Sequence, residues 1–176
     1  MSLVQWLKKV PSRLEYTEDL FSGKLMLGKA SLSAKLIRGD GSIKDYGVVC
    51  EKKVTGAFVT FIVAQMVTET SEIGDFKYHD SGVGVTGEVN TNTVIETTDG
   101  ESRATGNQVA GGTGTAPTYT TVGTIAYTTT KAITEHGVFS QVTGGTLLDR
   151  SVFTAINVVS GDSIQFTYVA TFNAEA

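Results

Sequence analysis

The stretch that decides the fold class runs from Lys131 to Phe172 and reads KAITEHGVFSQVTGGTLLDRSVFTAINVVSGDSIQFTYVATF. Its last ten residues alternate between apolar and polar side chains, with Val169 as the single exception. One face takes Ile164, Phe166, Tyr168, Ala170 and Phe172, and the other takes Ser163, Gln165, Thr167 and Thr171. Successive side chains of a strand leave opposite faces of its sheet, so this period of two predicts a half-buried strand in an antiparallel sheet.

Composition extends this interpretation to the whole chain. The 176 residues suffice for one domain with a core. With 40% hydrophobic and 18% charged residues, the chain is too apolar for disorder and too polar for a membrane protein. Thr is the commonest residue, and 20 Gly against 2 Pro favour strands joined by tight turns. No long apolar run follows Lys8 and Lys9, so we expect neither a signal peptide nor a membrane anchor.

The expected elements follow from local patterns. Residues 31–38 and 43–49 flank a Gly-Asp-Gly-Ser turn and predict a β-hairpin, with the tripeptide Arg38-Gly39-Asp40 serving that turn. Residues 54–67 have helical apolar spacing and predict a short helix against the sheet. The lone cysteine, Cys50, predicts a small buried side chain. Short strands with turn signals between them are typical of a sandwich or barrel. We therefore expect a mainly β protein, an antiparallel β-sandwich of jelly-roll type with one short helix.

The N-terminal residues differ in pattern from the rest. Residues 3–10 could form one short helical face that ends before Pro11, and the apolar residues after it keep no sustained period. We expect 1–30 to be an arm or wrapping segment and 31–176 to be a single sandwich domain; packing of the segment on its own sandwich is an equal alternative. If the segment is an arm, its apolar side chains would contact another subunit, namely Trp6, Leu7, Tyr16 and Phe21.

Charge is divided along the chain. Residues 1–60 hold ten Lys and Arg against six Asp and Glu, whereas 61–176 hold four against twelve, which gives +4 and −8 and sums to −4. The basic charges are scattered among acidic ones, which argues against a nucleic-acid site and favours a solvated or protein-facing surface.

Two motifs suggest chemistry, and both have a structural interpretation. The pattern Gly82-x-Gly84-x-x-Gly87 matches a dinucleotide fingerprint, but the residues that follow, EVNTNTVIETT, predict a strand where that fingerprint needs a helix. The glycines are expected to serve a turn or bulge. His79 lies beside Asp80 and His136 beside Glu135. Neighbours on a strand point to opposite faces, so neither pair converges on a metal, and we expect hydrogen-bonded histidines with one end in water. No catalytic, cofactor or metal residue is predicted.

Three charged residues sit inside apolar C-terminal segments: Glu135, Asp149 and Arg150. Such groups are usually paired or lie at a sheet edge. We expect Arg150 to pair with an acid of its own chain or of a neighbouring subunit.

Several segments together resemble a family of small virion structural proteins from tailed bacteriophages. They are ITEHGVFS, GGTLLDRSVF, SGDSIQFTY, FKYHDSGVGVTGE at 76–88 and ESRATGNQ at 101–108, within residues 34–172. The resemblance implies a virion component that performs no catalysis. We expect a capsid decoration (cement) protein that is made in the bacterial cytoplasm and binds the outer surface of the major capsid protein as a dimer or trimer. A tail or fibre component that binds a host surface is the alternative, and an enzyme such as a depolymerase or esterase is disfavoured.

Overall fold

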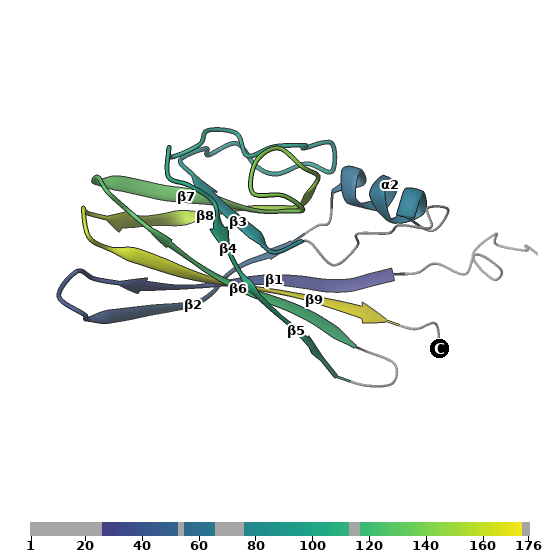
Figure 1. The fold of residues 1–176 in the computed structure, drawn as a ribbon, viewed down its shortest axis with the longest axis horizontal. Coiled ribbons are helices and arrows are strands. Elements are labelled where there is room, and N and C mark those ends of the chain that lie inside the picture. The colour runs from purple at the N-terminus through teal and green to yellow at the C-terminus, as the bar shows by residue number, and fades with distance from the viewer. Residues whose placement is uncertain (1–25, 53–54, 66–75, 113–116, 174–176) are drawn as a thin grey trace, which may run out of the picture.

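The computed structural model describes residues 26–52, 55–65, 76–112 and 117–173, and within them the chain is mainly β (Figure 1). The elements in chain order are β1 Met26–Ile37, β2 Ile43–Lys52, α2 Gly56–Gln65, β3 Tyr78–Gly82, β4 Ala104–Thr105, β5 Asn107–Gly111, β6 Thr118–Ala126, β7 Lys131–Phe139, β8 Leu147–Val158 and β9 Ser163–Asn173.

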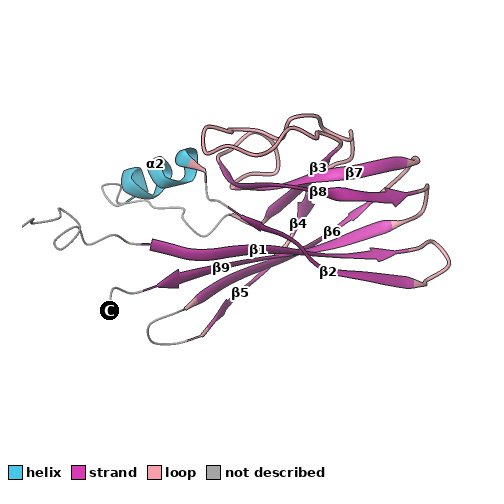
Figure 2. Cartoon of the chain, turned by 180° about the vertical axis from the view of Figure 1, so that it is seen from behind, coloured by secondary structure: helices cyan, strands magenta, loops and turns pink. Residues whose placement is uncertain are grey.

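The strands form two antiparallel sheets that face each other as a β-sandwich. The first has the order β2-β1-β9-β6-β5, and the second has the order β4-β3-β7-β8. Figure 2 shows the two layers from behind, with α2 beside one end of them and long loops above the second sheet. The predicted antiparallel sandwich is therefore confirmed, and the described residues contain one short helix.

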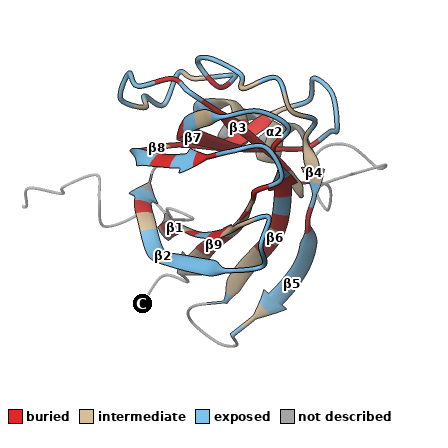
Figure 3. Cartoon of the chain, turned by 90° about the vertical axis from the view of Figure 1, so that its left-hand side faces the viewer, coloured by how far each residue is buried: buried red, intermediate tan, exposed pale blue. Residues whose placement is uncertain are grey.

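Strand β9 provides the centre of the core, as its alternation predicted. It pairs with β1 on one side and with β6 on the other. Ile164, Phe166, Tyr168 and Ala170 are all at most 1% exposed. They face buried residues of the second sheet such as Phe153, whose ring centroid lies 6.2 Å from that of Phe166. Figure 3 shows buried positions on the strands of both layers.

The predicted hairpin is formed by β1 and β2. Arg38 and Ser42 close its turn with a backbone hydrogen bond, and Gly41 has the positive φ of 84° that the turn requires. Nη1 of Arg38 lies 2.6 Å from a carboxylate oxygen of Asp162, which is 1% exposed. The Arg-Gly-Asp tripeptide thus lies in a turn, with its arginine paired inside the chain.

The predicted helix is present in the structure, and most of the expected arm lies outside the described residues. Helix α2, Gly56–Gln65, lies within the predicted range of 54–67, and the hydroxyl of Thr55 caps it by accepting a 3.2 Å hydrogen bond from the Phe58 amide. Residues 1–25 of the expected arm lie outside the described residues. Strand β1 begins at Met26, so residues 26–30 belong to the sheet.

Candidate functional site

The most elaborate surface of the described chain is the long connection between β3 and β4, residues 83–103, which we call the upper loop. It crosses above the second sheet (Figure 1). The sequence predicted a strand at 88–98. This prediction is wrong, because the segment forms no strand and has a single β-bridge, from Thr98 to Gly82. The backbone amides of this segment bind side chains instead, beginning with a buried carboxylate on β7.

That carboxylate is Glu135, which is completely buried. Its Oε1 accepts hydrogen bonds from the amides of Gly84 at 2.9 Å and Thr97 at 2.7 Å. Its Oε2 accepts one from the amide of Glu96 at 2.9 Å. One side chain therefore joins the two arms of the upper loop, and it supplies the acceptors that a neighbouring strand would otherwise provide.

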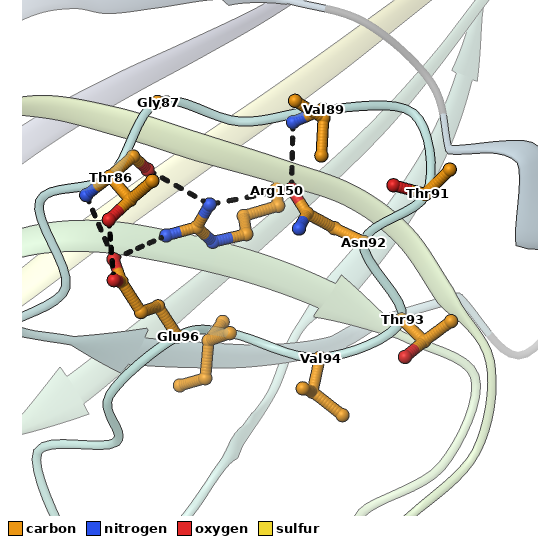
Figure 4. A pocket seen from close by; sticks show the side chains of 10 residues that line it. Thr86, Gly87, Val89, Thr91, Asn92, Thr93, Val94, Glu96 and Arg150 are labelled. Atoms are coloured by element: carbon orange, nitrogen blue, oxygen red, sulfur yellow. Dashed lines mark hydrogen bonds and ion pairs between the residues drawn. The ribbon is translucent and has the colours of Figure 1, made fainter.

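Arg150 on β8 completes the anchor. Its Nε donates to Oε2 of Glu135 at 2.8 Å, so the predicted pairing with an acid of its own chain is present. Its Nη1 donates to the Thr86 carbonyl at 3.1 Å, and its Nη2 lies 3.2 Å from Oε2 of Glu96 (Figure 4). The side chain is 2% exposed, so it is not itself part of the surface. Its role is to hold the upper loop in place.

Glu96 links this anchor to the solvent. Its carboxylate accepts hydrogen bonds from the Thr86 hydroxyl at 2.6 Å and the Thr86 amide at 2.8 Å. These bonds, followed by the charge of Arg150, lower the pKa of Glu96 below its ordinary value. The carboxylate is thus ionised at neutral pH and holds Thr86 and Glu96 together across the upper loop.

The close approach of the loop to Glu135 explains two glycines of the apparent dinucleotide motif. A Cβ atom on Gly84 would lie 2.4 Å from Oε1 of Glu135, and one on Gly82 would lie 2.6 Å from the same atom. No helix follows the third glycine, since residues 88–98 are loop. The role of Gly82 and Gly84 is therefore steric, and not the expected one of forming a turn or bulge. Only glycine lets the backbone come this close to the Glu135 carboxylate.

The anchored loop presents apolar side chains and a shallow pocket to solvent. Val85 is 73%, Val94 is 61% and Val89 is 54% exposed. The pocket measures about 370 Å³ and is lined by Thr86, Gly87, Val89, Thr91, Asn92, Thr93, Val94, Ile95, Glu96 and Arg150 (Figure 4). We call these exposed valines and the pocket beside them the loop platform.

A second anchor fixes the far end of the upper loop. Nε of Arg103 lies 2.8 Å from a carboxylate oxygen of Asp80, and its Nη1 donates to the carbonyls of Gln141 and Gly144. The guanidinium also lies 3.5 Å from the centre of the Phe139 ring. Arg103 therefore ties the upper loop to the turn between β7 and β8.

The two histidines meet inside the sandwich, which the sequence pattern did not predict. His136 and Glu135 do point to opposite faces, as predicted for neighbours on a strand. His79 and His136 are both fully buried, so the expectation that one end of each reaches water is wrong. Nδ1 of His79 lies 3.0 Å from Nε2 of His136, and Nε2 of His79 lies 3.0 Å from the hydroxyl of Thr121.

Burial determines the protonation of this pair. It lowers the pKa of His79 to about 4, and together with the neighbouring His79 it lowers the pKa of His136 well below its ordinary value. Both imidazoles are therefore neutral at physiological pH. In the register of β3 and β7, His79 lies opposite Val138 and His136 opposite Ser81, so the histidines are diagonal neighbours.

Of the predicted interface residues, Arg150 lies within the described part of the chain. Trp6, Leu7, Tyr16 and Phe21 lie outside the described residues. Among the residues described, no three His, Cys, Asp or Glu side chains are grouped so that they could hold a metal ion. The described helix is too short to cross a membrane.

Comparisons of the chain with protein-family models, with curated proteins and with solved structures give no match. A function therefore has to be inferred from the sequence, the fold and the loop platform.

Proposed function

We propose that this protein is a non-enzymatic capsid decoration protein that binds the outer surface of a tailed-phage head and stabilises the shell. The proposal joins the resemblance of residues 34–172 to phage virion proteins with a surface suited to protein contact. Its partner would be the major capsid protein, with self-association into a dimer or trimer. It requires no nucleic acid, membrane or cofactor, and the protein would be made in the bacterial cytoplasm before joining the virion.

The observation that carries the proposal is how the buried charges are used. Glu135 and Arg150 direct their hydrogen bonds to each other and to the upper loop. A buried polar network of this kind fixes one conformation of the segment it holds. The segment exposes Val85, Val89 and Val94, so the network preorganises a contact surface, and preorganisation reduces the entropy cost of binding.

The N-terminal segment would add a second contact. In this proposal residues 1–25 lie over a neighbouring capsid subunit, with Trp6, Tyr16 and Phe21 as anchors, because large aromatic side chains dominate interface energies. The full-length variant Trp6→Ala/Tyr16→Ala/Phe21→Ala should bind capsid shells more weakly and unfold at the same denaturant concentration as the unmodified chain. Unchanged shell binding would remove the segment from the proposal.

The deciding experiment is the number of copies of this chain per purified virion, measured by quantitative mass spectrometry against the major capsid protein. A ratio near one, or a simple fraction of one, would support a symmetry-matched head protein. A handful of copies per particle, or none, would contradict head decoration.

A tail or fibre component that binds a host surface is the second candidate, and the pocket of the loop platform favours it. Three threonines, Asn92 and Glu96 line this pocket, and such groups can hydrogen-bond the hydroxyls of a saccharide. A low copy number, together with binding to host cells that Asn92→Ala weakens, would support this candidate over decoration.

The jelly-roll type of the sandwich is part of the same proposal. The chain passes between the sheets at β2–β3, β4–β5, β6–β7 and β8–β9, as expected when Greek-key connections link two sheets. Such a fold leaves loops and edges free for neighbouring subunits.

A further inference from the structure

One edge of the sandwich differs from the other described edges in having no protection against pairing with another strand. That edge is β5, the last strand of the five-stranded sheet. An edge strand presents unpaired N–H and C=O groups, and proteins usually protect such groups with charges, bulges, short strands or covering segments. The described chain has four sheet edges, formed by β2 and β5 in the first sheet and by β4 and β8 in the second.

Three edges carry such protection. Strand β2 exposes Lys44, Asp45 and Glu51, and its pairing with β1 is interrupted by two register shifts. Strand β4 is two residues long. On β8, the hydroxyl and amide of Thr55 and the thiol of Cys50 donate to three backbone carbonyls, those of Leu147, Leu148 and Val152.

Within the described residues, strand β5 shows none of these features. Its residues Asn107–Ala110 are exposed, and its pairing with β6 runs without a register shift. No charged residue occurs anywhere between Arg103 and Lys131, so both β5 and the adjacent β6 are uncharged. Val109, at the midpoint of β5, is 59% exposed.

We infer that β5 pairs with β5 of a second copy of this chain, antiparallel and about a two-fold axis near Val109, which joins the two five-stranded sheets into one. A second copy suits the edge because an uncharged strand meets its own copy without repulsion between like charges. A two-fold contact is also closed, since it uses up the open edge of both copies and stops further growth. Figure 3 places β5 on the lower layer, away from the upper loop, so both surfaces can be occupied at once.

The inference does not depend on the capsid proposal, because the isolated full-length protein tests it. A contact made by one short strand is small, so association is expected to be weak and should be followed by analytical ultracentrifugation up to about 1 mM protein. We expect a monomer–dimer equilibrium. A monomer over the whole range would overturn the inference and leave the edge to a strand of another protein.

Two charged variants locate the contact. Val109→Lys should raise the dimer dissociation constant about fivefold or more, because two lysines would then face each other across the axis. Val48→Lys on the protected β2 edge is the matched control, since Val48 is 57% exposed, and it should leave dimerisation unchanged. Equal effects of the two variants, or none from Val109→Lys, would overturn the assignment.

Charge exchange and crosslinking test the geometry directly. An equimolar mixture of Val109→Lys and Val109→Glu should dimerise more strongly than either variant alone, which a merely destabilised strand could not do. Val109→Cys should form a covalent dimer on oxidation, while the unmodified chain should not, because its Cys50 is buried. Failure of both tests would exclude pairing centred near Val109.

Discussion

Oε2 of Glu135 accepts a 2.8 Å hydrogen bond from Nε of Arg150, and the two side chains are 0% and 2% exposed. Removing two charges from water is costly, and a buried pair adds little net stability over a well-packed apolar pair. This pair is better understood through its further partners, the amides of Gly84 and Thr97 and the carbonyl of Thr86. It determines the conformation of the upper loop, which has no sheet of its own to define it.

Breaking the pair from one side should be severe. Arg150→Ala would leave the carboxylate of Glu135 buried without its cation, and we expect a loss of about 3–5 kcal/mol in the free energy of unfolding. Urea unfolding at pH 7 measures this. The control is Lys35→Ala, which removes a half-exposed pair with Asp45 and should cost less than about 1 kcal/mol. Similar losses for the two variants would show that the Glu135–Arg150 pair is not the anchor described here.

The steric requirement at Gly84 gives a second prediction. In Gly84→Ala the new methyl group would lie 2.4 Å from Oε1 of Glu135, which hydrogen bonds hold in place, and we expect a loss of about 1–3 kcal/mol. Gly87→Ala is the control, because nothing lies within 4 Å of its Cβ position and its φ is not positive. That variant should be as stable as the unmodified chain or slightly more stable. Urea unfolding of both variants decides, and a tolerated alanine at 84 would contradict the described approach.

The buried histidine pair predicts how stability depends on pH. The pKa of His79 falls from 6.5 in the unfolded chain to about 4 in the folded protein. Protons therefore bind the unfolded state first, so stability is fully present above pH 6.5 and is lost as the pH falls toward 4. For His79 alone the loss over this window is about 3 kcal/mol, and His136 shifts in the same direction.

Two measurements check this dependence. Imidazole ¹⁵N chemical shifts of the folded protein should stay those of neutral rings from pH 7.5 down to about 5.5. The urea midpoint should fall over the same range. A histidine that titrates near its ordinary pKa while the fold remains intact would rule out the burial described for the pair.

The parts of the structure that the sequence predicted are those governed by local patterns. The alternation in β9 identified the central strand, and the Gly-Asp-Gly turn identified the β1–β2 hairpin. The strand prediction at 88–98 failed because EVNTNTVIETT has strand-forming residues, whereas Glu135, distant in sequence, binds the amides of Gly84, Glu96 and Thr97. The sequence predicted that Arg150 would pair with an acidic residue. It did not identify Glu135 as that residue, because the partner depends on strand register.

The histidine pair was missed for the same reason. His79 and His136 become neighbours only once β3 pairs with β7 in one register. A single signal was available in the sequence, since glycines stand where other strands face the pair. A Cβ on Gly123 would lie 2.4 Å from the ring of His79. An isolated glycine inside a strand, such as Gly123 in β6, marks such a close approach.

The loop platform predicts a separation between folding and capsid binding. Val85 and Val94 are mostly exposed, so Val85→Asp/Val94→Asp should change the free energy of unfolding by no more than about 0.5 kcal/mol per site. In a capsid contact, however, each carboxylate would be buried without a partner, and binding should weaken by at least tenfold. The control is Val48→Asp/Val159→Asp, which alters comparably exposed valines on β2 and in the β8–β9 turn, away from the upper loop. Cosedimentation of the full-length variants with purified capsid shells measures how strongly each double variant binds. Equal binding by the two double variants would remove the loop platform from the capsid contact.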